Sequence, residues 1–421
     1  MNERADLAAA VTAPAPAPAA VSESTEQVTQ PGLTQPVRRS PALVVFGIVG
    51  VILASVVMLF VVVYIISGLG ADAFALGGIM ALVPLAIVFI VVRWIDRWEP
   101  EPRLAVLFAF LWGAGVAVLI ALIVGVEIDN VVNSLGGAGS GYEFFSAAIQ
   151  APIVEEGGKG LGILVIFWFA RKHFDGPVDG LVYAAWVAGG FAFTENIMYF
   201  GSQLLEVGGF DGNVYEIFLI RGLMSPFAHV MFTVCTGIAL GFAARRTGAF
   251  GAIGFFLLGL VPAILLHSLW NGALFFVYDF YGYYGIVQVP LFVMGVVLVM
   301  YLRRQETKLT HDRLTEYANV GWFNPDEINA LATPNGRRLA LNWAKQRGIG
   351  AVMKRYLRDA TRLAFARQRI ITSRNTIGAA ADEAALLGAI LESRRALHGA
   401  TAAVATAATA PKTDLSPSGA A

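Results

Sequence analysis

The sequence has little charge and only one cysteine. Of its 421 residues 14% are charged and 57% are hydrophobic, and the mean hydropathy is +0.65, whereas soluble domains average about 25% charged and roughly 45–50% apolar residues. This shortage of charge excludes an ordinary soluble protein and indicates an integral membrane protein. The single cysteine, Cys235, excludes an intramolecular disulfide and any metal site built from several cysteines.

The ends of the chain differ from its middle in composition. The first thirty residues lack the apolar core of a secretory signal, so we expect the first membrane segment to direct insertion. Residues 303–398 hold 17 Lys and Arg against 9 Asp and Glu, as expected of a cytoplasmic region near anionic lipid. We therefore expect a disordered cytoplasmic tail at 1–40, a transmembrane domain at 41–302, a basic helical cytoplasmic region at 303–400 and a disordered tail at 401–421.

Two patterns in the basic region predict helices. Asn324-Pro325-Asp326-Glu327 has the N-cap residue, proline and early acids of a helix start. The run Ala351–Arg369 interleaves apolar and basic residues at helical spacing, a pattern more typical of a solvated or lipid-facing surface than of a nucleic-acid site. The expected partners of the protein therefore include the lipid bilayer and no nucleic acid.

Between these ends, apolar stretches long enough to span a bilayer follow one another. We identify eight: 41–67, 73–92, 104–126, 144–170, 180–200, 217–243, 249–278 and 285–302. Loops rich in Lys and Arg alternate with loops that carry Asp and Glu, and the positive-inside rule then places both termini in the cytoplasm. The sequence predicts an all-α polytopic membrane protein. Two readings stay open for residues 128–143, an external loop or a segment that re-enters the membrane.

Four successive spans carry polar side chains at depth. They are Glu155, Glu156 and Lys159 in the fourth span, Glu195 in the fifth, His229 in the sixth, and His267 and Asn271 in the seventh. A charge near the bilayer centre costs roughly 2.5–3.5 kcal/mol on insertion scales, so these residues are expected to act together. Counted from the cytoplasmic charges at about 1.5 Å per residue, the Glu and His residues lie about 24–27 Å from the cytoplasmic edge. The four helices should therefore meet in one cluster, displaced from the midplane toward the outside.

Spacing within the helices adds detail to this cluster. Lys159 shares a helix face with Glu155 and reaches Glu156, so it is as readily an ion-pair partner as a catalyst. Gly157 and Gly158 permit close approach of a neighbouring helix or an extended peptide. Three Glu against one Lys leave a formal charge of −2, which must be met by bound protons, a divalent cation or water. The two histidines suit metal ligation or proton transfer.

Two chemistries fit these residues equally well. A carboxylate could activate water for hydrolysis, with or without a metal, while His and Asn stabilise an oxyanion. The same groups could instead relay protons or cations in a transporter. Transporters often contain repeated halves with broken helices, and no such repeat is evident here, which favours an enzyme. A non-catalytic membrane scaffold is a third reading.

The motifs resemble those of a known family. Glu155-Glu156-Gly-Gly-Lys159 matches E-E-x-x-K, Phe191-Ala-Phe-Thr-Glu195 matches F-x-x-x-E, and His229 and His267-Ser-Leu-Trp-Asn271 match later histidine motifs. Together these residues resemble the PrsW family of intramembrane proteases, with a more distant similarity to the CAAX prenyl endopeptidases. The resemblance covers roughly residues 80–300 and implies hydrolysis of a peptide bond within the membrane.

The resemblance also implies roles for individual residues. Glu155 or Glu156 would be the general base, His267 and Asn271 would hold the oxyanion, and Lys159 and Phe191 would support them. Glu195 stands where the prenyl proteases have a histidine, which leaves open a divalent metal such as zinc. Its candidate ligands are Glu156, Glu195, His229 and His267. The substrate would be a membrane-anchored protein, such as an anti-sigma factor or a similar regulator, in a bacterial plasma membrane.

Overall fold

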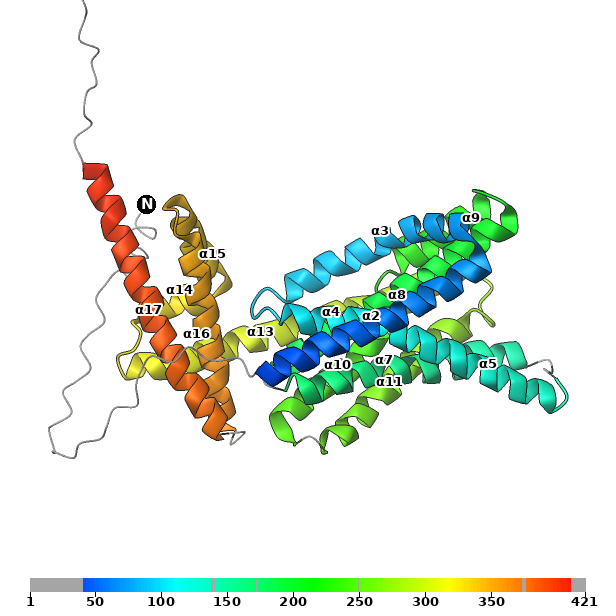
Figure 1. The fold of residues 1–421 in the computed structure, drawn as a ribbon, viewed down its shortest axis with the longest axis horizontal. Helices are drawn as coiled ribbons and strands as arrows, with labels where there is room; N and C mark the ends of the chain where they lie inside the picture. Colours follow the sequence, from blue (N-terminus) through cyan, green and yellow to red (C-terminus); the bar gives the residue numbers. More distant parts are fainter. Residues whose placement is uncertain are drawn as a thin grey trace, which may run out of the picture. The chain divides into compact units, whose positions relative to one another are not determined.

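The protein is helical throughout the part of the chain that the structure describes. The computed structural model describes residues 41–137, 139, 141–171, 173–248, 250–372 and 376–409, and within these ranges it contains helices and no strands (Figure 1). The all-α prediction is therefore confirmed. The predicted N-terminal tail at 1–40 lies outside the described residues.

The chain divides into two compact units, one of residues 39–304 and one that contains the chain from Gln305 onward. The helices of the first unit are α2 (Pro41–Leu69), α3 (Ala71–Ile95), α4 (Arg103–Leu111), η1 (Trp112–Ala117), α5 (Val118–Ser134), α6 (Tyr142–Phe145), η2 (Ser146–Gln150), α7 (Ala151–Phe169), α8 (Pro177–Val207), α9 (Gly212–Ile217), η3 (Phe218–Met224), α10 (Ala228–Arg246), α11 (Ala252–Ala273), α12 (Phe280–Tyr283) and η4 (Tyr284–Gln288). Helix α13 (Val289–Asn319) contains the boundary between the units. The four η segments are π-helical turns, which are frequent at functional sites.

Six helical stretches of the described chain are long and apolar enough to cross a membrane. They are Gly47–Leu69, Ala71–Ile95, Arg103–Ser134, Gly212–Arg246, Ala252–Ala273 and Phe280–Asn319. Each overlaps one predicted span. The other two predicted spans coincide with α7 and α8, the helices that carry the buried glutamates, and their crossing of the membrane stays a prediction.

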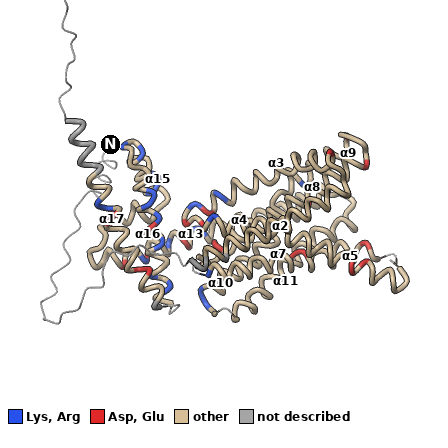
Figure 2. The backbone as a smooth tube through the Cα atoms, viewed as in Figure 1, with Lys and Arg blue, Asp and Glu red and all other residues tan. Residues whose placement is uncertain are grey.

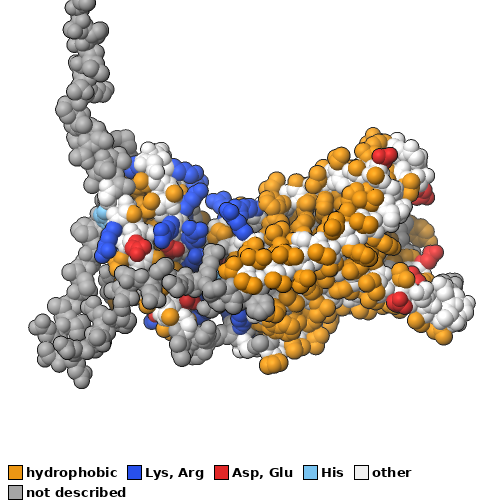
Figure 3. Space-filling view, viewed as in Figure 1, with side chains coloured by type: hydrophobic (Ala, Val, Ile, Leu, Met, Phe, Trp, Pro, Cys, Tyr) orange, Lys and Arg blue, Asp and Glu red, His pale blue; other side chains and the backbone are white. Residues whose placement is uncertain are grey.

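The surface of the first unit matches a bilayer environment. Large apolar side chains of α2, α3 and α11 are exposed, among them Leu59, Ile90 and Leu258, and they form a continuous apolar surface in Figure 3. Within this unit, Lys and Arg gather at the end of the helix bundle where α10 finishes, together with some acidic residues near α4, whereas the opposite end, near α5 and α9, carries Asp and Glu (Figure 2). The basic residues are thus concentrated at one end of the bundle.

Helix α8 is the centre of the first unit and packs against α3, α10 and η1. Glycine allows the closest of these approaches, because a Cβ built on Gly180 would lie 1.9 Å from the Gly237 carbonyl oxygen. One helical turn away, a Cβ on Gly241 would lie 2.4 Å from the Gly176 carbonyl oxygen. Along the chain, Gly176 and Gly180 are four residues apart, as are Gly237 and Gly241, which is the small-xxx-small spacing of tightly packed membrane helices. This contact brings α8 and α10 together, and with them Glu195 and His229.

The loop between α3 and α4 is fastened to α8. The amide of Glu101 donates to Asp96 Oδ1 over 3.0 Å, and Tyr183 donates its hydroxyl to Glu101 Oε2 over 2.5 Å. Burial raises the pKa of Asp96 to about 6. Burial, followed by the charge of nearby Asp179, raises the pKa of Glu101 well above its usual value. This loop therefore contains buried carboxyl groups outside the apolar spans.

The second unit contains α14 (Pro325–Ala332), α15 (Pro334–Gln346), α16 (Gly350–Ile371) and α17 (Thr376–Thr409) around an apolar core. The predicted helix start is confirmed, because the Asn324 side chain accepts from the Glu327 amide over 2.7 Å. Helix α17 continues past residue 400 to Thr409, where its sequence is rich in alanine, the strongest helix former. The first part of the predicted disordered tail is therefore helical, and residues 410–421 lie outside the described residues.

Candidate active site

Helix α7 places two carboxylates and a lysine in the interior of the first unit. Glu156 and Lys159 are 1% and 0% exposed, and the Lys159 Nζ donates to Glu156 Oε1 over 2.7 Å and to Glu155 Oε2 over 3.3 Å. The indole of Trp112, on η1, donates to the Gly158 carbonyl over 3.0 Å and so fixes α7 beside these groups. The three residues therefore form one buried ion-pair group.

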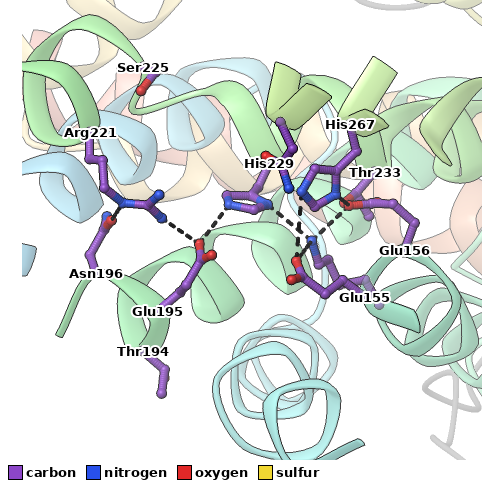
Figure 4. Close-up of polar contacts among 12 residues, drawn as sticks. Glu155, Glu156, Thr194, Glu195, Asn196, Arg221, Ser225, His229, Thr233 and His267 are labelled. Carbon is purple, nitrogen blue, oxygen red and sulfur yellow. Dashed lines mark hydrogen bonds and ion pairs between the residues drawn. The ribbon is translucent and has the colours of Figure 1, made fainter. Parts of the chain in front are cut away.

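Each of the two histidines is oriented by its own carboxylate. His267 Nδ1 lies 3.0 Å from Glu156 Oε1, and His229 Nε2 lies 2.7 Å from Glu195 Oε2 (Figure 4). Because a carboxylate only accepts hydrogen bonds, both of these ring nitrogens are donors. In the neutral rings the second nitrogens, His229 Nδ1 and His267 Nε2, then carry a lone pair that can accept a hydrogen bond or bind a metal.

These two acceptor nitrogens are directed toward α7. Lys159 Nζ donates to His229 Nδ1 over 3.1 Å, and His267 Nε2 lies 3.9 Å from Glu155 Oε2. The two imidazole rings meet edge to face with their centroids 5.2 Å apart. Side chains from α7, α8, α10 and α11 thus meet as the count of depth predicts, whereas their catalytic roles stay predictions.

Two residues of the cluster were missed by the sequence argument. Arg221, on η3, donates to Glu195 Oε2 over 2.6 Å and to Asn196 Oδ1 over 3.0 Å. Thr233, four residues after His229 on α10, donates its hydroxyl to Glu156 Oε2 over 2.7 Å. The sequence does single out Arg221. It is the one basic residue on the predicted outer side, where the loops otherwise carry Asp and Glu. Thr233 has the weaker signal of sharing a helix face with His229.

Arg221 corrects the predicted charge of the cluster. Three Glu against Lys159 and Arg221 leave a formal charge of −1 rather than −2. The cause is the π-helical turn η3, which directs a side chain from the start of the sixth predicted span back onto Glu195. One positive charge, or one proton, therefore balances the cluster.

Two further predicted residues lie at the edge of the cluster. The ring of Phe191 lies 4.0 Å from Lys159 Nζ, a cation–π contact that fits the supporting role predicted for it. The amide of Asn271 instead donates to the Ala147 carbonyl over 2.8 Å. Among the described residues no hydrogen bond joins Asn271 to the cluster, so this side chain fastens α11 to η2.

The cluster is open on one side. The side chains of Glu155, Glu195, His229 and Arg221 are 13%, 13%, 12% and 20% exposed, whereas that of Glu156 is fully buried. A Cβ on Gly157 would meet nothing within 4 Å, so the surface of α7 is open at that glycine. The Glu155 side chain is therefore partly accessible, whereas that of Glu156 is not.

One set of residues in the cluster has the geometry to hold a metal ion. Glu155, His229 and His267 each offer a ligand atom, and these atoms lie within 4.8 Å of one another. One carboxylate with two imidazoles is a ligand set of zinc hydrolases. Glu156 and Glu195, which were expected among the ligands, instead each accept a hydrogen bond from a histidine. Carboxylates in that position orient metal-binding histidines.

The fold and this cluster define a polytopic helical membrane protein. Its interior holds a Glu/His cluster of the kind found in hydrolases. A family model described as PrsW family intramembrane metalloprotease matches residues 101–301. The chain is 28% identical over 250 residues to Protease PrsW of Clostridioides difficile (strain 630), covering 57% of this chain and 91% of that protein. It is 33% identical over 174 residues to Protease PrsW of Bacillus subtilis (strain 168), covering 41% of this chain and 71% of that protein. No solved structure matches.

The chain belongs to the PrsW family, as its motifs suggested. It is an intramembrane endopeptidase of a bacterial membrane, and its substrate is a protein in that membrane. This assignment favours hydrolysis over the transport reading that the residues alone left open. The family is one of metalloproteases, in agreement with the ligand set of Glu155, His229 and His267.

Proposed function

We propose that the protein cleaves a membrane-anchored protein, such as an anti-sigma factor or a similar regulator, at the cluster around Glu155. The observation that carries this proposal is the convergence of Glu155, His229 and His267, with each histidine held by a second carboxylate. The open side of the cluster is consistent with entry of an extended peptide beside Gly157. The membrane is proposed to be the bacterial plasma membrane.

Glu155, His229 and His267 are the residues that would hold a divalent ion such as zinc. When bound, such an ion supplies Lewis-acid polarisation of the scissile carbonyl and activation of water. Glu155 is the carboxylate assigned to the reacting atoms, because it is partly exposed and its Oε1 accepts no hydrogen bond from the described residues. That oxygen would take the proton of the attacking water.

The other members of the cluster position these groups. Glu156 fixes the tautomer and orientation of His267 and is itself held by Lys159 and Thr233. Glu195 does the same for His229 and is held by Arg221. Asn271 is assigned to packing rather than to the oxyanion, because its amide is engaged by Ala147.

The assignment of Glu155 is tested by comparing membrane proteins that accumulate in cells expressing wild-type protein, Glu155→Gln or Glu143→Gln. Glu143 is an exposed carboxylate on α6 outside the cluster, so its variant serves as the control. Glu155→Gln should slow cleavage by at least roughly 10²–10⁴-fold, the usual contribution of a general base, because it also removes a candidate metal ligand, while membrane insertion is unchanged. Cleavage at the wild-type rate by Glu155→Gln would show the assignment to be wrong. Removal of divalent metal with a chelator should abolish cleavage, and added zinc should restore it.

Both termini are proposed to lie in the cytoplasm, with 41–302 as the protease domain and 303–400 as a cytoplasmic region. The gathering of basic residues at one end of the bundle supports this orientation (Figure 2). Because the chain has one cysteine, a Cys235→Ser background allows single-cysteine labelling in intact cells. A cysteine at Glu206 should react with a membrane-impermeant reagent, and one at Arg246 should not. The reverse labelling pattern would mean that both termini lie outside the cytoplasm.

A further inference from the structure

Lys159 lies where a cation in the cluster would bind. Its side chain is fully buried, and its ammonium contacts Glu156 Oε1 at 2.7 Å, His229 Nδ1 at 3.1 Å and Glu155 Oε2 at 3.3 Å. A lysine ammonium has three donors and no acceptor, so these three contacts use all of its hydrogen-bonding capacity. The ring of Phe191 lies on a further side, 4.0 Å away.

Two of these three acceptors belong to residues of the candidate metal site. Glu155 and His229 are in the ligand set, and the His229 nitrogen that accepts from Lys159 is the one not engaged by Glu195. An imidazole nitrogen has a single lone pair, so it cannot accept a hydrogen bond and bind a metal at the same time. Metal–ligand bonds are also about 2.0–2.2 Å long, which would bring the ion into direct repulsion with an ammonium in contact with the same atoms.

We propose that Lys159 and a divalent metal ion are alternative occupants of one cation site, so that metal loading requires the lysine ammonium to leave Glu155 and His229. This inference rests on the metal site of the proposed function. The contact between Lys159 and Glu156 is outside the ligand set, so it can persist when the other two contacts break. The flexible four-carbon stem of lysine permits such a shift without movement of α7.

The experiment measures binding of zinc chloride to purified full-length protein in detergent, after removal of metal with a chelator, by calorimetry and by metal analysis at one pH. Lys159→Met keeps the length of the side chain and removes its charge. It should bind zinc at least about tenfold more tightly than wild type, because a charge in contact with the ligands is removed. Adding Glu155→Gln to Lys159→Met should abolish the gain.

The matched control is Arg221→Met, which removes the other positive charge of the cluster. Arg221 contacts Glu195 and none of Glu155, His229 and His267. Its variant should gain less zinc affinity than Lys159→Met. An equal or larger gain would mean that net charge rather than a shared site controls binding, and would overturn the proposal. Equal affinities of wild type and Lys159→Met would overturn it too, as would absence of zinc binding in both.

A second comparison protects the test against misfolding, since Lys159→Met leaves two carboxylates without their partner. In the double variant Glu156→Gln/Lys159→Met only one carboxylate, Glu155, is left without its partner, so these three positions keep the net charge of −1 that they have in wild type. The double variant should again bind zinc more tightly than the single one, and the opposite order would contradict the proposal. Cleavage that does not depend on Glu155 would refute the proposed function. The zinc affinities would still decide the role of Lys159.

Discussion

The Thr233 hydroxyl donates a hydrogen bond of 2.7 Å to Glu156 Oε2, so a side chain of α10 holds the carboxylate that orients His267. Thr233→Val would leave a buried charged oxygen without its donor. We expect a loss of about 1–3 kcal/mol in the free energy of unfolding and a lower midpoint of thermal unfolding in detergent.

Thr236 supplies the control for this change. It is buried on the same helix, but its hydroxyl has no hydrogen-bond partner among the described residues. Thr236→Val should therefore leave the midpoint unchanged or raise it. If the two variants lose the same stability, the hydrogen bond to Glu156 is not what matters at position 233.

Glu195 is predicted to act through His229 rather than on the substrate. Glu195→Gln keeps the shape of the side chain but weakens its hold on the His229 Nε2 donor. We expect zinc affinity and cleavage rate to fall together by about 10–100-fold, the usual effect of losing a carboxylate that orients a metal-binding histidine. A fall in cleavage with unchanged zinc affinity would instead place Glu195 among the groups that contact the substrate.

The close approach of α8 and α10 depends on glycine. A Cβ at position 180 would overlap the Gly237 carbonyl oxygen at 1.9 Å, so Gly180→Ala must separate the two helices that carry Glu195 and His229. We expect reduced thermal stability and loss of cleavage. In Gly254→Ala, on α11, the new Cβ meets nothing within 4 Å, and the change should be neutral or stabilising. Equal behaviour of the two variants would contradict the packing argument.

Stability near the loop between α3 and α4 should depend on pH through Asp96. Its folded pKa of about 6 lies above its ordinary value near 3.8. The folded state therefore favours the protonated carboxyl, and this contribution is lost as pH rises through 6. Asp96→Asn cannot ionise, so it removes this loss of stability at high pH, and its side-chain oxygen can still accept the hydrogen bond from the Glu101 amide. The variant should gain stability relative to wild type at pH 7.5 and not at pH 4. A gain of the same size at both pH values would refute this.

The second unit contains its own buried ion pair. Arg394 donates to Glu327 through two nitrogens at 2.8–3.0 Å, and the Tyr356 hydroxyl donates to the same carboxylate. Arg394→Met would leave Glu327 buried without its cation, at a cost of roughly 3–5 kcal/mol. The exposed neighbour Arg395 is the control, and Arg395→Met should change stability by less than about 0.5 kcal/mol. Hydrogen exchange of α14 and α17 in the full chain would detect the difference.

The sequence by itself determined the class of protein and the positions of six of the eight predicted spans, and it predicted a common depth for the polar residues. Depth follows from residue number because the rise of a helix is fixed, so Glu155, Glu195, His229 and His267 could be placed at one level without coordinates. The N-cap at Asn324 was equally visible, since capping is local chemistry.

Only the tertiary structure decided which group pairs with which. The rotation of each helix about its axis depends on contacts between distant segments, such as Gly180 against Gly237. These contacts assign Glu156 to His267 and Glu195 to His229, and turn Asn271 toward Ala147. They also set Lys159 among the ligands of a candidate metal site, a position that follows from packing and that no spacing along α7 could specify.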